Sequence, residues 1–356
     1  MPSFLYKLTV FVVGIVRAIR EKRLQWELKY NHRKRVRSYG TEQVLTKEQE
    51  KQIQEYYAPY KKVTTEFHNF YTKITGQFHA NYLPDDMYYS YIDTYYNDWR
   101  ECSHIDNKCF YPRMFINIRQ AENIACRIRG LWFTGDCRQI SREELDAIMA
   151  KEPEVVVKMA TDSEGGKGVF FVKGTEVNSV LPRIRDDIVI QRPLKQHETL
   201  AAINASSINT IRMISLISEE GVKIYSSILR MGISGARVDN ASSGGITCGI
   251  TEDGKLKKYA NKVNGQRFDK HPDSGLAFEG YEVPGYQKCL DAVPMLHAQM
   301  PRFRLVSWDF AIDPDGEPVL IEANLHYGEL DFHQINNGPI FGEDTEKILK
   351  EVFNKR

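Results

Sequence analysis

Hydrophobic and polar positions follow two different periods along this chain. Runs typical of strands occupy residues 154–160, 169–174, 186–191, 207–217, 222–231, 305–312 and 318–322. Turn-forming residues separate the last four runs into two pairs, which are therefore predicted to form hairpins. A helix is predicted to begin at Ser141, because Glu144 completes a capping box three residues later.

Helical periodicity also prevails over residues 41–75. The positions expected to form its packed stripe are Val44, Ile53, Tyr56, Tyr57 and Tyr60. Helices that alternate with hairpins predict an α+β fold with antiparallel sheets, and they argue against a doubly wound parallel sheet.

Charge sets the first residues apart from the rest. The formal net charge is +1, but residues 1–38 hold ten Lys or Arg against two Glu, a balance of +8 that leaves −7 for the remainder. The apolar run at 9–16 is too short to span a bilayer, and no small-residue cleavage site follows it, so no signal peptide is predicted.

Two interpretations of this basic segment remain open. Its cations are interleaved with Leu24, Trp26 and Leu28, which suits a helix lying on the anionic inner leaflet of a membrane. The alternative is a helix that packs on the domain and turns a solvated basic face outward. No nucleic-acid-binding module accompanies the charge, so no nucleic-acid partner is predicted.

The six cysteines contain no CxxC pair. This usage favours a reducing compartment and argues against a zinc site or a disulfide framework. We therefore expect a cytoplasmic protein, with peripheral contact at the inner face of the cell membrane under the first interpretation of the basic segment.

The hairpin at 305–324 carries the first candidate site. A loop at 314–317 makes paired residue numbers sum to 631, which sets Asp309 across from Glu322, and alternation adds Asn324 to the same face. Opposed carboxylates repel each other unless a cation lies between them. Such oxygen ligands suit Mg²⁺ or Mn²⁺; the alternative is an exposed hairpin whose acids face water.

A lysine and a glycine-rich loop indicate phosphate binding. Lys158 lies in the middle of an apolar strand, where a buried ammonium group needs an anion. The loop DSEGGKG at 162–168 runs into a strand, so it is not a Walker loop, but its N–H groups could cover phosphates. A flexible polar turn is the alternative. Lys108 offers a second cation, and Gln191 on the next strand could reach an adenine.

Two arginines complete the set. A loop at 219–221 makes paired numbers sum to 440, so Thr210 faces Arg230, and Arg212 points from the same face. Paired guanidinium groups suit a transferring phosphoryl group or a carboxylate. The alternative is a pair of structural ion pairs with acids elsewhere.

The order of these features resembles the ATP-grasp superfamily. The softer motifs YLPDD, DNKCFYPRMF and NLHYGELDFHQINNGPIFG are most similar to the sugar-transfer-associated ATP-grasp proteins of bacterial surface-polysaccharide biosynthesis. The similarity covers roughly residues 80–345. It implies two α+β lobes that clasp ATP, with 106–194 as the N-terminal and lid subdomains and 195–356 as the catalytic subdomain. Residues 1–38 and a helical region at 39–105 would precede them.

The resemblance also implies roles for single residues. Arg212 and Arg230 would hold the γ-phosphate and the acyl phosphate, acting with Lys158. Metal ligands would be Asp309, Glu322 and Asn324, which would bind two Mg²⁺ ions. The residues implied to bind ATP or line the acceptor groove are Lys108, Lys158, Ser163, Gly165, Gly166, Lys167, Gly168, Gln191, Arg192, Leu194, Asn240, Ser243, Gly244 and Gly245. Many relatives have an acid in place of Gln191.

The expected reaction is ATP-dependent ligation. A small-molecule or saccharide carboxylate would form an acyl phosphate, which an amine or hydroxyl would then attack, as in the attachment of an amino acid to a sugar acid. Two rivals are a kinase on the same scaffold, which would phosphorylate a hydroxyl, and a non-catalytic nucleotide-binding scaffold at the membrane. His326 and His333 follow the metal ligands, as acid-base groups or as packing residues.

Overall fold

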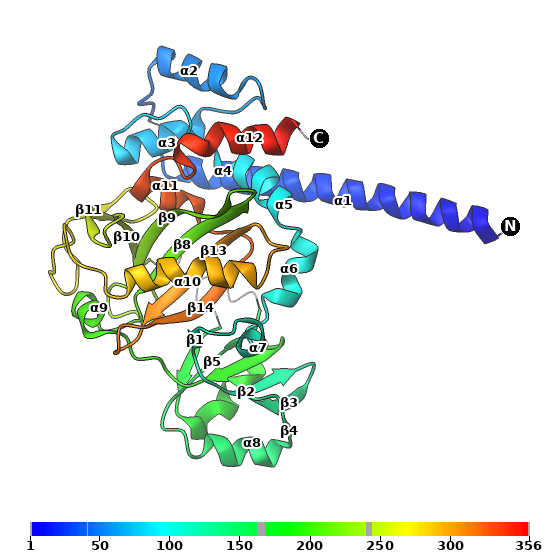
Figure 1. Cartoon of the computed structure of the whole chain (residues 1–356), viewed down its shortest axis with the longest axis vertical. Coiled ribbons are helices and arrows are strands. Elements are labelled where there is room, and N and C mark those ends of the chain that lie inside the picture. Colours follow the sequence, from blue (N-terminus) through cyan, green and yellow to red (C-terminus); the bar gives the residue numbers. More distant parts are fainter. Residues whose placement is uncertain (1, 41, 162–167, 240–243, 355–356) are drawn as a thin grey trace. The chain divides into compact units, whose positions relative to one another are not determined.

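The chain is described by a computed structural model that covers residues 2–40, 42–161, 168–239 and 244–354 (Figure 1). It divides into two compact units. Residues 1–95 and 338–356 form the first unit, and residues 96–337 form the second. The C-terminal helix thus groups with the N-terminal helices rather than with the region that begins at 195.

The first unit is helical. Its helices are α1 (Pro2–Ser38), α2 (Lys47–Tyr57), α3 (Glu66–Thr75), α4 (Asp85–Met87), the π-helical η1 (Tyr88–Ile92), α5 (Asp93–Tyr96, at the unit boundary), the 3₁₀ turn η6 (Gly342–Asp344) and α12 (Thr345–Asn354). Ile53 and Tyr57 are buried as predicted, whereas Val44 is 39% exposed. Val44 is a wrong prediction because α2 begins only after its N-cap, Thr46.

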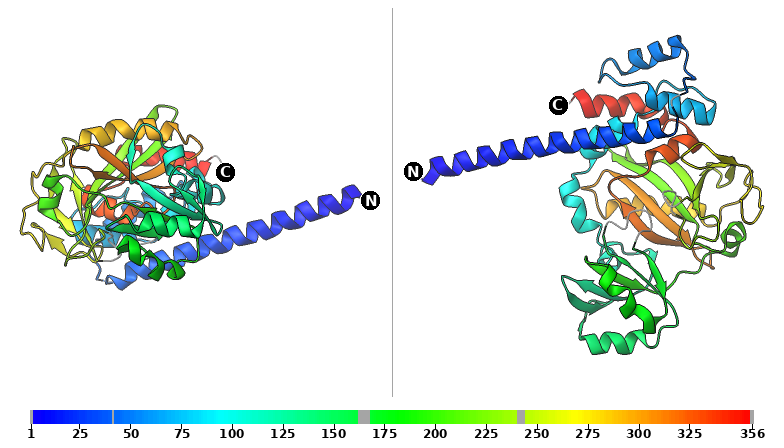
Figure 2. Two further views of the ribbon diagram at one scale, coloured as in Figure 1. Left: turned by 90° about the horizontal axis from the view of Figure 1, so that it is seen from below. Right: turned by 180° about the vertical axis from the view of Figure 1, so that it is seen from behind.

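Helix α1 is anchored to its own unit by its C-terminal part. Near its C-terminal end Val36 is buried, Arg33 pairs with Asp86, and Arg37 pairs with Glu66, both with N–O distances of 2.6 Å. Its N-terminal part extends beyond the other helices of this unit (Figure 2). None of the helices in the described ranges contains a stretch long and apolar enough to cross a membrane.

The second unit contains an eight-stranded sheet. Its strands, in spatial order, are β1 (Arg119–Gln120), β14 (Pro318–Asn324), β13 (Leu305–Ile312), β8 (Thr210–Ser218), β9 (Gly221–Met231), β10 (Ile246–Ile250), β11 (Leu256–Asn261) and β12 (Arg267–Phe268). All neighbours are antiparallel except β1 and β14.

Two helices cover opposite faces of this sheet. Tyr286 on α10 (Tyr286–Ala298) donates a hydrogen bond to Ser227, while His333 on α11 (Leu330–Asn337) contacts the adjacent Ser226. Adjacent strand residues point to opposite faces, so α10 and α11 lie on different sides. Short helices α6 (Trp99–Ile105), α7 (Tyr111–Met114) and α9 (Glu198–Ile203) connect to the sheet.

A six-stranded antiparallel sheet forms the rest of the unit (Figure 1). Its strands, in spatial order, are β4 (Gln139–Ile140), β3 (Leu131–Thr134), β2 (Asn123–Ile128), β7 (Ile188–Gln191), β5 (Val155–Met159) and β6 (Phe170–Val172). One face packs on α8 (Arg142–Met149) and on the 3₁₀ turns η3 (Gly174–Ser179) and η4 (Leu181–Arg183). The capping box of Ser141 and Glu144 is confirmed, as is the α+β class with antiparallel sheets.

Both predicted hairpin registers are confirmed at the candidate site residues. Asp309 pairs with Glu322, and Thr210 pairs with Arg230. Each turn is nevertheless one residue tighter than predicted, because Ile312 pairs with Pro318 and Ser218 with Gly221. A bulge in each hairpin restores the predicted register further along the strands, since it adds one residue to one strand.

Candidate active site

The α11 face of the large sheet carries a buried charge cluster centred on Asp309. Arg212 faces Asp309 across β8 and β13, and its Nε and Nη2 each donate to one carboxylate oxygen at 2.6 Å. Arg230 Nη1 donates to Oδ2 at 3.0 Å. Burial opposes ionisation of Asp309, but the two arginines, Arg212 foremost, outweigh it and hold the pKa of this carboxyl below its usual range.

A second acid, which the sequence reasoning missed, completes the cluster. Glu329 accepts a hydrogen bond from Arg212 Nη1 at 2.6 Å, and its carboxylate lies 3.7 Å from Arg230 Nε. Glu329 has a left-handed backbone (φ 58°), as does Tyr327, with Gly328 between them. A non-glycine residue adopts this conformation at a cost, so the surrounding contacts must hold the turn. The one sequence signal was an acid in the segment directly after the predicted ligand strand.

Glu322 lies beside this cluster and pairs with Lys108. The Lys108 Nζ to Glu322 Oε1 distance is 2.6 Å, and the Lys108 side chain is 3% exposed. The Lys108 backbone N–H donates to Ala160 O at the end of β5. Lys108 therefore links the two sheets, with its backbone bonded to the small one and its side chain to the large one. Asn324, on the same strand as Glu322, donates to Ser307 O at 3.1 Å.

Among the predicted site residues, Lys158 has a lowered pKa and no carboxylate close to its ammonium group in the described structure. It lies on β5, and burial followed by the nearby Lys108 charge lowers its pKa to about 8, while Glu322 raises it. Within the described ranges, no carboxylate comes within 4.0 Å of its ammonium group. Both lysines and Glu322 thus come together as predicted, and Lys158 has the surroundings of a group that requires an anion.

These positions test whether ATP and Mg²⁺ fit the residues present. The Lys158 ammonium, on a half-buried side chain without a counter-ion in the described structure, fits a phosphate. Glu322 and Asn324 are half-buried on one face and supply oxygen atoms that suit Mg²⁺. Both oxygens of Asp309 already accept hydrogen bonds from guanidinium groups. Repulsion between the facing acids is thus relieved by protein cations, and the role of Asp309 as a metal ligand stays a prediction.

Among the described residues, no group of three or more His, Cys, Asp or Glu side chains has the arrangement of a metal site. The predicted ligand set contains only two such side chains, with an amide as the third member.

The residues predicted to hold adenine make other contacts. Gln191 Nε2 donates to Asn123 Oδ1 at 2.7 Å, and the Arg192 guanidinium pairs with Glu122 and Glu152. The backbone N–H of Arg192 donates to Glu122 O. The side chain of Gln191 is therefore part of the small sheet's internal network, and Leu194 is half-buried after the strand ends. Their role in binding adenine stays a prediction.

Part of the predicted loops lies outside the described residues. This applies to Ser163, Gly165, Gly166, Lys167, Asn240 and Ser243. Of the remaining loop glycines, Gly168 and Gly244 have left-handed backbones, with φ of 83° and 98°, and Gly245 is buried before β10. Glycine adopts positive φ without a steric cost, which accounts for these residues at the two loop ends.

His333 is fully buried on the same face as the arginines. Its Nδ1 lies 2.7 Å from Ser226 Oγ. Burial, and then the charge of Arg212, lower the pKa of His333 to about 3. It is therefore a neutral packing and hydrogen-bonding residue at physiological pH and no source of positive charge for the site.

Part of this chain is similar to a known sequence family. Residues 176–350 match the sequence model of a family described as sugar-transfer associated ATP-grasp. The resemblance read from the order of motifs is thereby confirmed for this stretch. No protein with a curated description matches the sequence significantly.

Solved structures with similar folds include three enzymes of low sequence identity. An ADP complex of N5-carboxyaminoimidazole ribonucleotide synthetase is 11% identical, with a TM-score of 0.38, and 62% of this chain covers 45% of that one. D-alanine-D-alanine ligase from Coxiella burnetii is 14% identical (TM-score 0.39; 70% of this chain, 58% of that chain). VanG D-Ala:D-Ser ligase from Enterococcus faecalis is 12% identical (TM-score 0.41; 70% of this chain, 61% of that chain). The chain thus spans about half to three fifths of the length of these structures.

Proposed function

We propose that this protein is an ATP- and Mg²⁺-dependent ligase, because residues 176–350 match the sequence model of the sugar-transfer associated ATP-grasp family. It would join a carboxylate, such as that of a sugar acid or polysaccharide precursor, to an amine or hydroxyl through an acyl phosphate. The observation that carries this proposal is the half-buried Lys158, which stands beside Lys108 and Glu322 without a carboxylate of its own in the described structure.

Different residues would bind the ATP phosphates and the metal ion. Lys158 and Lys108 would bind the ATP phosphates, and Lys108 would exchange its contact with Glu322 for one with a phosphate oxygen. Glu322 and Asn324, with Asp309 as the further predicted ligand, would hold Mg²⁺, which neutralises the charge that develops on the transferring phosphoryl group. Two ions, or Mn²⁺ in their place, are part of the proposal.

Arg212 and Arg230 would position the reacting oxygens. Their planes are fixed by Asp309 and Glu329 at 2.6 to 3.7 Å, so little reorganisation is needed when a phosphoryl or carboxylate group arrives. The substrate carboxylate attacks the γ-phosphorus and ADP leaves. The amine or hydroxyl then attacks the acyl carbon, and inorganic phosphate leaves as the new bond forms.

Hydroxylamine offers a test that does not require the natural nucleophile. The full chain is incubated with MgATP, hydroxylamine and a panel of sugar acids that includes glucuronate and galacturonate. A ligase forms a hydroxamate with equal amounts of ADP and inorganic phosphate. A phosphate ester without inorganic phosphate would establish the kinase instead. Unchanged thermal stability on addition of MgATP would refute nucleotide binding and favour the scaffold.

We further propose peripheral contact of α1 with an anionic membrane. Phe11, Ile19, Trp26 and Tyr30 are 53–66% exposed, and at about 100° per residue they fall within an arc of about 100° of the helix circumference. This apolar stripe lies on a segment with a charge of +8, a combination suited to lipid headgroups.

Vesicle flotation tests the contact. A chain that lacks residues 1–22 keeps the pairs of Arg33 and Arg37 with the rest of its unit. It should stay folded and no longer float with phosphatidylserine vesicles, whereas the full chain should float with these and not with neutral vesicles. Flotation of the shortened chain would contradict the proposal.

A further inference from the structure

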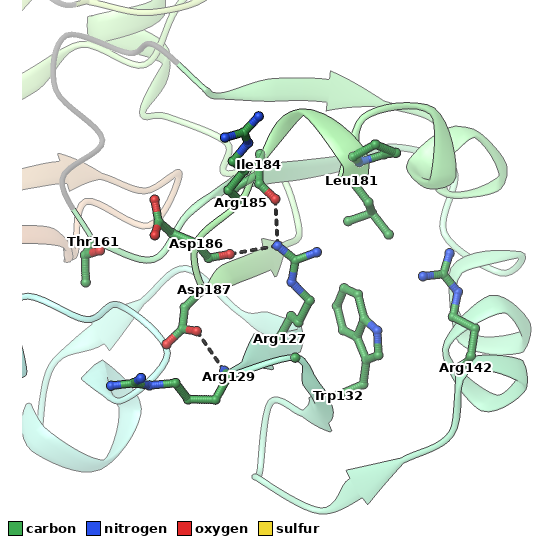
Figure 3. A pocket seen from close by; sticks show the side chains of 12 residues that line it. Arg127, Arg129, Trp132, Arg142, Thr161, Leu181, Ile184, Arg185, Asp186 and Asp187 are labelled. Carbon is green, nitrogen blue, oxygen red and sulfur yellow. Dashed lines mark hydrogen bonds between the residues drawn. The ribbon is translucent and has the colours of Figure 1, made fainter.

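An arginine-lined cavity of about 930 Å³ lies in the small sheet's lobe. Its walls come from the turn between β2 and β3, the first residue of α8, and the loop between η4 and β7 (Figure 3). Arg127, in its wall, shares a row with Ile188 and Met159, whereas Lys158 shares the adjacent row with Val189 and Cys126. Adjacent rows point to opposite faces, so the cavity is separate from the lysine site.

Two of the four arginines in the cavity wall are engaged by the protein. Arg127 Nη2 donates to the carbonyls of Ile184 and Asp186 at 2.7 and 2.8 Å. Arg142 Nη2 donates to Asn178, and its Nε lies 3.4 Å from Asp146. Both therefore serve mainly to hold the wall together.

The other two, Arg129 and Arg185, are exposed. For neither guanidinium group does the described structure contain an ion pair or hydrogen bond. Arg129 has a left-handed backbone (φ 50°) and precedes Gly130 (φ 86°) in a two-residue turn. Arginine is an unusual choice there, because such turns favour Asn, Asp or Gly. The fold thus keeps a charged side chain where a smaller residue would cost less strain.

The turn is held by an acid that also reaches the lysine site. Asp187 accepts the Arg129 N–H at 2.8 Å through Oδ1 and the Asn107 amide at 3.2 Å through Oδ2. Its backbone carbonyl accepts from Ala160 N–H, and Ala160 O accepts from Lys108 N–H, both at 2.9 Å. The cavity is therefore joined to Lys108 by a short chain of hydrogen bonds.

The rest of the wall combines apolar residues with two acids, Asp186 and Asp187. It includes Trp132, Leu181 and Pro182, and the Arg142 guanidinium lies 5.8 Å from the centroid of the Trp132 ring. In Figure 3, Trp132 and Arg142 lie at one end of the cavity and Arg129 lies toward Thr161 at the other. A ligand that matches both ends has an apolar ring face and a separate negative charge.

We propose that this cavity is a second binding site, for an anionic saccharide whose phosphate or carboxylate is held by Arg129 and Arg185 and whose ring lies against Trp132. The volume is within the range of small-ligand sites, about 300–1,000 Å³. The inference does not depend on the proposed ligase reaction, because its residues lie on the other face of the sheet.

Binding of glucose 1-phosphate and of glucuronate to the full chain tests the site. Glucose and inorganic phosphate serve as probes that lack either the charge or the ring. Calorimetry gives the affinity, and Trp fluorescence, compared with a Trp132→Phe variant, reports contact with the ring. Arg129→Gln with Arg185→Gln removes the two free charges. Arg138→Gln with Arg183→Gln removes two charges of the same lobe outside the cavity wall and is the matched control.

We expect the first double variant to lose at least tenfold in affinity for one charged saccharide, the control to change less than twofold, and the fluorescence response to vanish in Trp132→Phe. Which of the two saccharides binds identifies the anion as phosphate or carboxylate. Equal affinity for inorganic phosphate would overturn the saccharide assignment. Loss of binding in Lys158→Gln with none in the arginine double variant would place the probe at the lysine site and refute the cavity, as would the absence of binding.

Discussion

The two sheets of the second unit differ in whether the cations of the candidate site have carboxylate partners in the described structure. On the large sheet, Arg212 and Arg230 share Asp309 and Glu329, so that both guanidinium charges have carboxylate partners within the protein. On the small sheet, Lys158 is half-buried without a carboxylate in the described structure, and its pKa is lowered to about 8. One side of the site is thus paired in advance, and the other side has a charge for which the protein supplies no partner there.

From this difference we expect the arginines to position the reacting groups and the lysines to bind the nucleotide. A guanidinium group held by two acids has a fixed orientation and gains little from a further anion, whereas a desolvated ammonium group gains a great deal. We therefore expect changes in the arginine cluster to act first on folding, and changes around the lysines to act first on nucleotide binding and turnover.

The largest effect should follow from Asp309→Asn. Two buried guanidinium groups would lose their shared anion, since the side chain is 2% exposed and bonds to both. Breaking a buried pair from one side costs about 3–5 kcal/mol. Urea unfolding should show this loss of stability, together with a loss of turnover.

Asp315→Asn is the matched control on the same hairpin. Asp315 pairs with Arg119 at the exposed turn, with its side chain 74% exposed, and exposed pairs contribute little. Equal unfolding midpoints for the two variants would show that the arginines do not depend on Asp309.

Glu322→Gln should act on catalysis instead. The side chain is 21% exposed and Lys108 is its partner, so the loss of stability should be smaller than in Asp309→Asn, because only one buried cation loses a contact. A charged ligand at the transferring phosphoryl group is worth about 10²–10³ in rate, and we expect a fall of that size in phosphate release. Glu317→Gln, which alters the exposed pair with Lys288 on the same hairpin, should retain full activity. Comparable activity in the two variants would remove Glu322 from the metal site.

Lys158→Gln should weaken nucleotide binding and leave stability unchanged or improved. The ammonium is desolvated without a partner in the described structure, so its removal relieves a cost. A lost hydrogen bond to a charged group is worth about 1.5–3 kcal/mol, or at least tenfold in affinity. Calorimetry with a non-hydrolysable ATP analogue measures this, with Lys151→Gln as an exposed control. A destabilised variant with normal affinity would show that Lys158 has a structural role.

The same contrast explains what the sequence could predict. Alternation and turn residues placed Asp309 against Glu322 and Thr210 against Arg230, although both turns are one residue shorter than expected. The bulges that compensate leave no signature in a single sequence, because an inserted residue changes neither the composition nor the local hydrophobic pattern. The facing pairs were thus predicted correctly, although the length of each turn was not.

Partners from distant segments were beyond such reasoning. Alternation shows that Arg212 and Arg230 share a face, but it cannot show that Glu329, which is held in a left-handed turn after the strand, reaches them. Likewise, alternation cannot show that Gln191 donates a hydrogen bond to Asn123 on a neighbouring strand, and the role of Gln191 in binding adenine stays a prediction. Periodicity gives the direction of a side chain, whereas its partner depends on how separate segments pack.

The smallest effect concerns pH. Because the pKa of Lys158 is lowered to about 8, the free protein loses this charge as the pH rises through 8, and a bound phosphate favours the charged form. Nucleotide affinity should therefore fall above pH 8, by up to about tenfold per pH unit, and binding should take up a proton. Calorimetry in two buffers of different ionisation enthalpy measures that uptake. Lys158→Arg keeps its charge throughout this range, so its affinity should stay level, and proton uptake by that variant would assign the titration to another group.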